Sequence, residues 1–299
     1  MTISYEGKVA IVTGAGGGLG RAYALALAKR GAKVVVNDLG GARDGSGTSN
    51  AAQKVVGEIE AAGGTAMANA SSVTDLAQVE AMVAEANEVW GGVHILINNA
   101  GILRDKSFAK MSMDDFRLVV EVHLIGSANC TKAVWETMRA QAYGRILMTS
   151  SSTGLYGNFG QANYGAAKLG LAGLAKTLAL EGAKYDIRVN SIAPTAATRM
   201  TEDIFPPEML AAFNPENVVP AALFLVSDDA PTNAIVGAGA GVVQAAYVTL
   251  TPGVALPEGD RTPEAVAAAW DRITDRTLEI VPQSGAEQAA TILRTLQGG

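Results

Sequence analysis

Short apolar runs alternate with longer amphipathic stretches along the chain as far as residue 192. Most of the apolar runs are rich in valine and isoleucine and are too short for helices, so they predict buried strands. The stretches between them are rich in alanine and leucine, and several end at glycine, which predicts helices. The predicted strands cover residues 8–13, 33–38, 65–70, 94–98, 145–149 and 187–192, and the predicted helices cover residues 19–30, 51–62, 75–90, 114–142 and 162–183.

Repeated alternation of strand and helix is typical of an α/β fold with a parallel sheet. The strands are nearly continuous apolar runs, as expected where helices cover both faces of the sheet. We therefore expect a Rossmann-like, doubly wound parallel sheet in three layers, forming a single domain over residues 1–251. Residues 252–299 are expected to form a C-terminal extension, packed on the same domain or on its dimer mate.

Two segments break this alternation. Residues 40–50 are rich in glycine, serine and aspartate, and we interpret them as a mobile surface loop rather than a second glycine cradle. Residues 195–214 lack a regular pattern and include two adjacent prolines, which is typical of a lid or binding loop. Beyond them the sequence predicts helices over residues 215–227 and 262–273, and two last strands over residues 234–243 and 246–250.

Composition narrows the class of protein. The 299 residues are 48% hydrophobic and 17% charged, as in ordinary globular domains. A net charge of −6 argues against a nucleic-acid partner, which would require a basic surface. Cys130 is the only cysteine, so no disulfide forms within the chain, which fits a reducing compartment. No apolar run reaches the roughly 18 residues of a membrane span, so we expect a cytoplasmic protein without a membrane partner.

A glycine-rich turn lies between the first predicted strand and the first predicted helix. Gly14, Gly18 and Gly20 follow a G-x-x-x-G-x-G spacing at this position. Glycines there let the backbone approach a pyrophosphate at the N-terminus of a helix, although a tight turn alone also needs glycine. In this strand–turn–helix setting the spacing predicts nucleotide binding.

Asp38 stands at the end of the second predicted strand. A carboxylate at this position accepts hydrogen bonds from a ribose 2′-hydroxyl and repels a 2′-phosphate. The alternative role for Asp38 is to form the turn before Gly40 and Gly41. We expect NAD rather than NADP as the cofactor.

Asn98, Asn99, Ala100 and Gly101 follow the fourth predicted strand. Asparagine and glycine can simply form a turn at such a position. The carboxyl edge of a parallel sheet is also where a dinucleotide lies, so these residues are candidates for the floor of the cofactor site.

Tyr164 and Lys168 are four residues apart in the helix predicted over residues 162–183, so their side chains share one face. A nearby cation favours phenolate and lowers the pKa of a tyrosine, which then exchanges protons with an alcohol or carbonyl oxygen. Ser151 follows a predicted strand and can be brought beside Tyr164. In isolation, such a pair is more often an ordinary surface contact.

These motifs, in this order, resemble the short-chain dehydrogenase/reductase family over about residues 7–240. The resemblance implies that Tyr164 is the general acid/base, that Ser151 holds the reacting oxygen of the substrate, and that Lys168 binds the nicotinamide ribose. It implies an NAD-dependent oxidoreductase acting on a CH–OH group. It also implies a cofactor site formed by Gly14, Gly18, Leu19, Gly20, Asp38, Ser72, Val73, Asn99, Ala100, Gly101, Tyr164, Lys168, Ala193 and Thr198.

Two positions depart from the family pattern. Many members have an asparagine in the long fourth helix that helps to relay protons, whereas this chain has His123. Histidine can also relay a proton, so His123 is a catalytic candidate, with a structural helix histidine as the alternative. The aspartate that often follows the third strand is replaced by Ser71, Ser72 and Val73, so a hydroxyl or backbone group must meet the adenine.

A narrower resemblance extends over nearly the whole chain. It is to the (3R)-hydroxyacyl-CoA dehydrogenase domains of peroxisomal multifunctional enzymes of type 2, also called 17β-hydroxysteroid dehydrogenase type 4. This subfamily implies NAD-dependent oxidation of a (3R)-3-hydroxyacyl-CoA to the 3-oxo form, a step of fatty-acid or steroid side-chain β-oxidation. The residues that carry the resemblance are 36–41, 99–105, His123, 157–164, 262–266 and Trp270.

Two other functions remain open on the sequence. One is a dehydrogenase of the same family that acts on a hydroxysteroid or another secondary alcohol. The other is a dinucleotide-binding sensor without turnover, which the complete set of Ser151, Tyr164 and Lys168 disfavours. The two histidines and one cysteine lie far apart in sequence, so no metal site is expected.

The expected partners follow from the same resemblance. An acyl-CoA is the expected small-molecule substrate, and Arg104, Lys106 and Lys110 are candidates to meet its phosphates or else form a solvated charged loop. Small residues such as Ala166 and Gly173 on the helix over residues 162–183 suit close helix–helix contact. With the family resemblance, they predict a homodimer, or a tetramer built from it.

Overall fold

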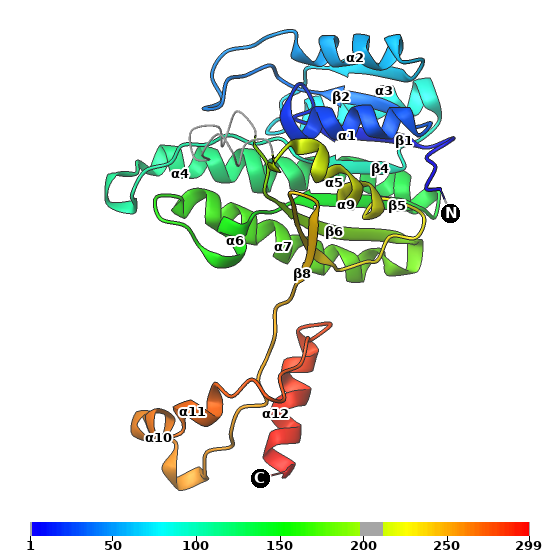
Figure 1. The fold of residues 1–299 in the computed structure, drawn as a ribbon. Coiled ribbons are helices and arrows are strands. Elements are labelled where there is room, and N and C mark those ends of the chain that lie inside the picture. The colour runs from blue at the N-terminus through cyan, green and yellow to red at the C-terminus, as the bar shows by residue number, and fades with distance from the viewer. Residues whose placement is uncertain (1, 198–211, 299) are drawn as a thin grey trace. The chain divides into compact units, whose positions relative to one another are not determined.

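The computed structural model describes residues 2–197 and 212–298, which form two compact units, Met1–Ala245 and Ala246–Gly299. The first unit contains a sheet of eight strands in the order β3-β2-β1-β4-β5-β6-β7-β8 (Figure 1). The neighbouring strands from β3 to β7 all pair in parallel. The strands are β1 (Val9–Thr13), β2 (Lys33–Asn37), β3 (Thr65–Asn69), β4 (Ile95–Asn98), β5 (Gly144–Thr149), β6 (Ile187–Pro194), β7 (Ile235–Gly239) and β8 (Val242–Ala246).

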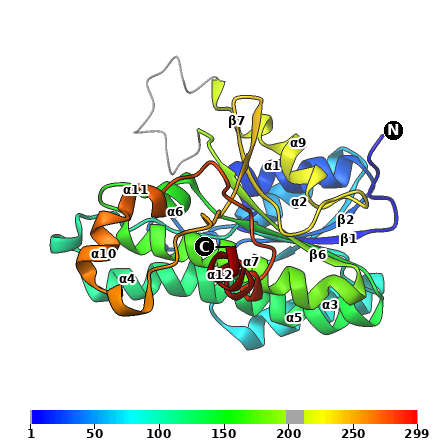
Figure 2. The ribbon, with the colours of Figure 1, turned by 90° about the horizontal axis from the view of Figure 1, so that it is seen from below.

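Helices cover both faces of the sheet, which confirms the predicted three-layer α/β architecture (Figure 2). One apolar core joins the sheet to α1 (Gly18–Lys29), α2 (Ala51–Ala61) and α9 (Val219–Phe224). The other core joins it to α3 (Leu76–Trp90), α5 (Gly126–Ala140) and α7 (Ala162–Gly182), and includes Cys130. The central strands β1, β4 and β5 are buried along their length. Their continuous apolar runs favour such burial on both faces.

The strand order reverses between β1 and β4, so the connections that follow these two strands lead to opposite faces of the sheet. The diverging connections leave room for a ligand beyond the carboxyl ends of β1 and β4. This position places the glycine turn after β1 and the Asn99 turn after β4 next to each other.

The helix predicted over residues 114–142 is interrupted. It consists of α4 (Met113–Val120), a π-helical segment (Glu121–Ile125) and α5. A π-helical turn inserts an extra residue and turns the following side chains, and such turns are frequent at functional sites. His123 lies within it.

The end of the first unit differs from the prediction. The segment predicted as one strand over residues 234–243 is a hairpin, because Ala240 and Gly241 both adopt positive φ and turn the chain between β7 and β8. The strand predicted over residues 246–250 is therefore shifted to Val242–Ala246. A short helix that the sequence did not predict, α6 (Ser152–Tyr156), follows β5, and Ser151 caps its N-terminus.

The second unit contains α10 (Pro263–Ala268), α11 (Trp270–Ile273) and α12 (Ala286–Gly298), the last of which the sequence did not predict. Leu250 and Ile280 exchange two backbone hydrogen bonds of 2.9 Å, and Thr295 donates to the Pro252 carbonyl at 2.8 Å. These contacts hold the unit together internally. The expected packing of this segment on the domain or its dimer mate stays a prediction.

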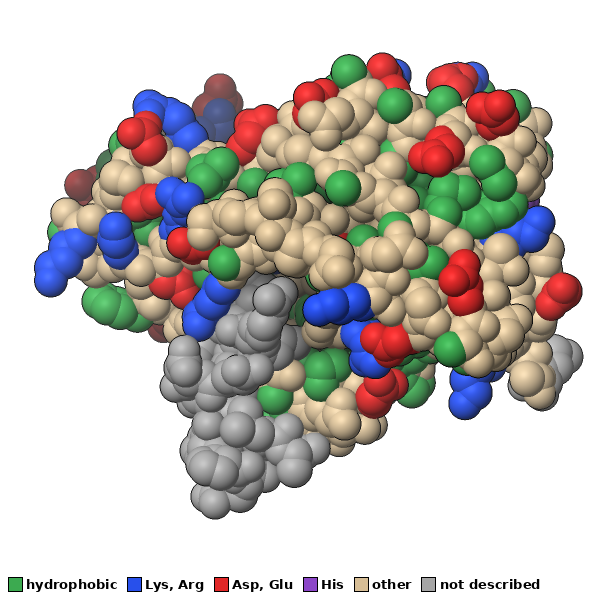
Figure 3. All heavy atoms as spheres, turned by 90° about the horizontal axis from the view of Figure 1, so that it is seen from above, with side chains coloured by type: hydrophobic (Ala, Val, Ile, Leu, Met, Phe, Trp, Pro, Cys, Tyr) green, Lys and Arg blue, Asp and Glu red, His purple; other side chains and the backbone are tan. Residues whose placement is uncertain are grey.

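The described residues lack two features. They contain no helix that is both long and apolar enough to cross a bilayer. They contain no group of three or more potential metal ligands. On the face shown in Figure 3, acidic and basic side chains are interspersed rather than gathered into a basic patch.

Arg145 anchors the amino edge of the sheet, away from the switch point. Its side chain is 1% exposed and donates to the carbonyls of Gly144, Asp186 and Ser227 and to the Asp186 carboxylate. We predict that Arg145→Met lowers the free energy of unfolding by about 3–5 kcal/mol, because several buried acceptors lose their donor. Urea unfolding measures this change.

Arg188→Met is the matched control for this prediction. Arg188 pairs with the same Asp186, but its side chain is 33% exposed, so water replaces the lost donor. We expect a loss of about 1 kcal/mol. Equal losses in the two variants would contradict the importance of burial at Arg145.

Candidate active site

The glycine turn after β1 lies against the turn after β4. Gly14 has a φ of +63°, and a Cβ atom there would lie 2.8 Å from the Ala100 Cα. A Cβ at Gly20 would collide with the Gly14 carbonyl and the Asn99 side chain. Only glycine therefore permits this approach of the two turns.

The Thr13 side chain joins the ends of β1 and β4. Its hydroxyl oxygen accepts hydrogen bonds from the backbone N–H groups of Asn99 and Ala100, both at 3.0 Å. The Asn99 side-chain amide donates to the carbonyls of Thr13 at 2.9 Å and Gly14 at 3.1 Å. The two turns therefore form one hydrogen-bonded unit at the switch point.

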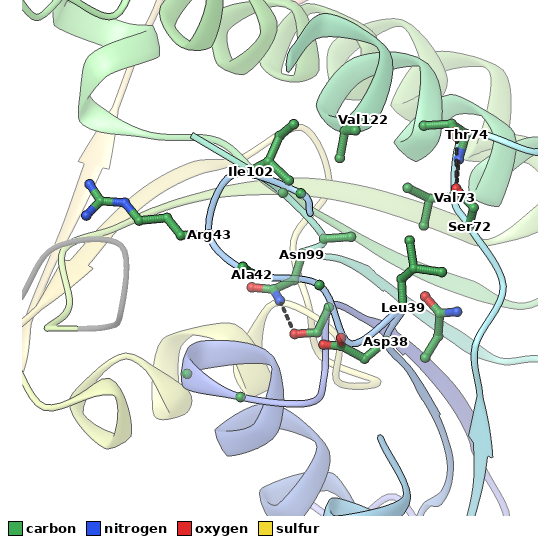
Figure 4. A pocket seen from close by; sticks show the side chains of 18 of the residues that line it. Asp38, Leu39, Ala42, Arg43, Ser72, Val73, Thr74, Asn99, Ile102 and Val122 are labelled. Atoms are coloured by element: carbon green, nitrogen blue, oxygen red, sulfur yellow. Dashed lines mark hydrogen bonds between the residues drawn. The ribbon is translucent and has the colours of Figure 1, made fainter. Parts of the chain in front are cut away.

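A cavity of roughly 330 Å³ opens beside this unit, within the size range of small-molecule sites (Figure 4). Asp38 and Leu39 lie toward one end of it with residues 72–74, and Ile102 and Arg43 lie toward the other. The predicted cofactor residues that line it are Gly14, Gly18, Leu19, Asp38, Ser72, Val73, Asn99, Ala100 and Gly101. The lining residues that the sequence reasoning missed include Ala42, Arg43, Gly45, Thr74, Ile102, Leu118 and Val122.

Residues 40–50 thus take part in the cavity, although the sequence suggested a mobile surface loop. The Leu103 N–H donates to the Arg43 carbonyl at 3.0 Å, and a Cβ at Gly45 would lie 3.2 Å from Ile102. The glycines were the feature of the sequence that could have indicated a defined loop, because Gly40 and Gly45 both adopt positive φ.

Asp38 is oriented by two backbone donors at the end of β2. Its carboxylate accepts from the Gly16 N–H at 2.7 Å and from the Gly40 N–H at 2.6 Å. It therefore both forms the turn and faces the cavity, so the two roles considered for it are compatible.

Ser151, Tyr164 and Lys168 come together, but none of the three lines the cavity. The Ser151 hydroxyl accepts from the Thr153 N–H at 3.1 Å, and its proximity opposes the rise in the pKa of Tyr164. The Lys168 Nζ lies 5.4 Å from the centroid of the Tyr164 ring and donates to the Thr149 carbonyl at 2.5 Å. Lys168 is 3% exposed, and no carboxylate among the described residues forms an ion pair with it.

The expected lowering of the Tyr164 pKa is not found in the protein alone. Burial raises the pKa of Tyr164 to about 12, against the opposing effect of Ser151, and the charge of Asp105 raises it further. Burial also lowers the pKa of Lys168 to about 7. The sequence-based expectation was wrong because it counted the neighbouring cation and neglected the loss of water around both groups.

His123 packs between the Asn99 turn and Tyr164. Its ring meets the Tyr164 ring edge-on, with centroids 5.1 Å apart. The Nε2 atom faces the N–H of Ile102 at 3.1 Å and its carbonyl at 2.8 Å, whereas the buried Nδ1 atom has no hydrogen-bond partner. Burial, with a smaller contribution from the charge of Lys168, holds the pKa of His123 well below its usual value. The imidazole is therefore neutral and positioned by the backbone of Ile102.

Three other predicted cofactor residues lie elsewhere. Gly20 packs beneath the glycine turn rather than lining the cavity. Ala193 is buried near the end of β6, at the same edge of the sheet. Thr198 lies outside the described residues.

The basic residues after the Asn99 turn are largely paired within the protein. Arg104 and Lys106 both contact the Asp115 carboxylate, at 2.9 and 3.3 Å. Asp115 lies in the first turn of α4, and its backbone N–H donates to the side chain of Ser112, which caps the helix. The interpretation of these residues as a charged surface cluster therefore has direct support, whereas contact with CoA phosphates stays a prediction.

Residues 8–208 match the family model of the short chain dehydrogenases. Peroxisomal multifunctional enzyme A of Dictyostelium discoideum is 50% identical over 295 residues, which cover 98% of this chain and 66% of that protein. A hydroxyacyl-CoA dehydrogenase of Mycobacterium tuberculosis is 39% identical over 288 residues, which cover 90% of this chain and 86% of that protein. The chain spans about two thirds of the length of its multifunctional relative.

Two solved structures share the fold. Full-length peroxisomal multifunctional enzyme type 2 of Drosophila melanogaster superposes with a TM-score of 0.83 at 40% identity, covering 99% of this chain and 50% of that one. A 7α-hydroxysteroid dehydrogenase, complexed with NADH and a 7-oxo bile acid, superposes with a TM-score of 0.72 at 32% identity. That match covers 81% of this chain and 96% of the hydroxysteroid dehydrogenase.

The burial of Lys168 predicts a pH-dependent stability. Burial lowers its pKa from the ordinary lysine value of 10.5 to about 7 on folding, so the unfolded chain binds more protons between these values. The stability of the unmodified chain should therefore rise with pH across this window, with the full penalty present below pH 7. In Lys168→Met this contribution should vanish, as urea unfolding at several pH values would measure.

Lys176→Met serves as the control, because it removes an amine from a partly exposed position of the same helix. It should retain the pH dependence of the unmodified chain. A Lys168→Met variant with the same pH dependence as the unmodified chain would show that the Lys168 amine is not desolvated.

Proposed function

Because the chain belongs to the short-chain dehydrogenase family and is an oxidoreductase acting on a CH–OH group, we propose that it oxidises a (3R)-3-hydroxyacyl-CoA with NAD. The product is the 3-oxoacyl-CoA. The observation that carries the proposal is the cluster of Ser151, Tyr164 and Lys168, which His123 links to the cavity at the switch point through its contacts with Tyr164 and Ile102.

The residues of the cavity fit NAD. The glycine turn precedes the N-terminus of α1, where backbone N–H groups suit a pyrophosphate. Asp38 faces the cavity with a carboxylate that suits a ribose 2′-hydroxyl and repels a 2′-phosphate, which supports NAD over NADP. Ser72 and Thr74 place hydroxyls at the same end, where the family often has an aspartate.

The chain's own residues handle the proton and the orientation of the substrate. Bound NAD supplies a hydride acceptor at the nicotinamide ring. Tyr164 accepts the hydroxyl proton as the carbinol C–H electrons leave with the hydride, and Ser151 holds the same oxygen by a hydrogen bond. Lys168 would donate to the ribose of the bound cofactor, and its ammonium form, favoured by these acceptors, would stabilise the phenolate of Tyr164.

His123 is proposed as a positioning group in this reaction. As a neutral ring it holds the backbone of Ile102 and leaves Nδ1 buried without a hydrogen-bond partner. A water molecule bound at Nδ1 would complete a proton path near Lys168.

The substrate class is supported by the similar proteins. A relative that matches 90% of the chain is named as a hydroxyacyl-CoA dehydrogenase. The neighbouring structure with a bound bile acid favours a hydroxysteroid as the second candidate. A sensor without turnover is disfavoured, because Ser151, Tyr164 and Lys168 converge in three dimensions.

A homodimer and a cytoplasmic location are part of the proposal. The exposed side of α7 carries Ala166, Leu169, Gly173 and Leu180, and a Cβ at Gly173 would meet no atom within 4 Å. An apolar helix face with an open small residue suits close packing against a second copy. The buried, unpaired Cys130 suits a reducing compartment.

Turnover of a substrate panel tests the proposed activity. We expect NADH formation, followed by its absorbance, from (3R)-3-hydroxybutyryl-CoA and little from the (3S) epimer or a steroid alcohol. Tyr164→Phe should reduce turnover at least about 1,000-fold while NADH binding persists, because only the proton acceptor is lost. Preferred turnover of the steroid would replace the acyl-CoA assignment by the second candidate.

The proposed dimer is tested by sedimentation. The unmodified chain should sediment as a dimer or tetramer at micromolar concentration, and Gly173→Glu should shift it toward the monomer by burying a charge at the interface. Glu121→Gln, at an exposed position of the π-helical segment, controls for the change of charge. A monomeric unmodified chain would contradict the proposal.

A further inference from the structure

Residues 40–50, called the strap below, form a closed loop at the cavity. The neck of the strap is tight, since a Cβ at Gly40 would collide with the backbone of Ser49. Inside the loop, the Ala42 N–H donates to the Ser46 carbonyl at 2.7 Å, and the Gly45 N–H donates to the Ala42 carbonyl at 3.0 Å. Compact loops with close ends are frequently functional.

One side of the strap faces the cavity. Gly41, Ala42, Arg43 and Gly45 line it, together with the switch-point turns. Ala42 and Arg43 lie on the Ile102 side, away from residues 72–74 (Figure 4). The strap therefore covers the part of the cavity that Ile102 lines.

The strap is docked on the segment that follows the Asn99 turn. Gly45 packs on Ile102, the Leu103 N–H bonds to the Arg43 carbonyl, and the Arg104 Nε donates to the Asp44 carbonyl at 3.2 Å. These contacts come from three successive residues, so they hold the strap along an edge rather than at a point.

Arg104 connects the strap to the catalytic helix. Its Nη1 atom pairs with Asp115 of α4 at 2.9 Å, and its carbonyl accepts from the Asn163 side chain at 3.1 Å. Asn163 is fully buried and directly precedes Tyr164 in α7. The same residue thus contacts the cavity cover and the start of the helix that carries the catalytic tyrosine.

We propose that the strap encloses the bound dinucleotide and that its docking on Ile102 and Arg104 sets the rate at which the dinucleotide is released. The inference rests on the proposed function, because it requires that the cavity binds NAD. It assigns cofactor contacts to Ala42 and Arg43 and positioning roles to Ile102 and Arg104. Release of NADH then requires the strap to leave this edge.

A pair of glycine variants tests the docking. Gly45 and Gly47 have φ values of +88° and +73°, so alanine strains the backbone at both positions. Only at Gly45 would the new Cβ meet Ile102, while at Gly47 it meets no atom within 4 Å. Gly45→Ala should therefore lift the strap, and Gly47→Ala provides the matched control.

The measurement is the dissociation rate of NADH, followed by its fluorescence in stopped flow with the full chain. We expect Gly45→Ala to release NADH about tenfold faster than Gly47→Ala. A factor of this size corresponds to the loss of roughly one hydrogen bond and the contact beside it. Equal release rates from the two variants would overturn the inference. Failure of the unmodified chain to bind NADH would instead refute the dinucleotide site itself.

Arg104→Lys provides a second test that does not depend on glycine. Lysine can keep the ion pair with Asp115, but its single amine cannot donate to the Asp44 carbonyl at the same time, as the guanidinium does. We expect faster NADH release with little change in the KM of the acyl-CoA. A raised KM with unchanged release would mean that Arg104 serves the substrate and would overturn its role at the strap.

Discussion

The buried amine of Lys168 is the constraint on which the catalytic geometry depends. It is 3% exposed, and it donates a hydrogen bond to the Thr149 carbonyl. A buried ammonium without a carboxylate partner is costly, and the pKa of Lys168 falls to about 7 in response. The protein alone therefore has a site that is short of acceptors for a cation. The ribose hydroxyls of a dinucleotide would supply such acceptors, so binding of the cofactor and activation of Tyr164 become linked.

The rest of the fold links this amine to the cavity through a series of contacts. The switch point places β1 beside β4, and Thr13 and Asn99 then join their two turns by hydrogen bonds. His123 extends this unit toward Tyr164 through the backbone of Ile102. The ends of distant strands and helices thus converge because polar groups at the sheet edge satisfy one another.

Local features of the site could be predicted from the sequence, whereas features set by distant contacts could not. Tyr164 and Lys168 are one helical turn apart, and Asp38 ends a strand, so spacing alone indicated their positions. The alternation of strands and helices likewise indicated the layers of the fold. The position of β1 beside β4 and the π-helical turn at His123 depend on packing between distant segments. The high pKa of Tyr164 depends on burial, which a pair of residues in a sequence does not reveal.

Residues 40–50 illustrate the same limit. Their glycine-rich composition is compatible with a mobile loop and with a closed one, and the distinction comes from Ile102 and Arg104, which lie far along the chain. The helix α12 was also missed, and its large apolar residues Ile292, Leu293 and Leu296 are exposed.

Direct titration of the Lys168 amine by nitrogen NMR, with and without NAD, tests the central claim most directly. The account predicts a pKa near 7 in the protein alone, with a clear rise when NAD binds, because hydroxyl acceptors favour the charged amine. A pKa at the ordinary lysine value in the protein alone, unchanged by NAD, would contradict it.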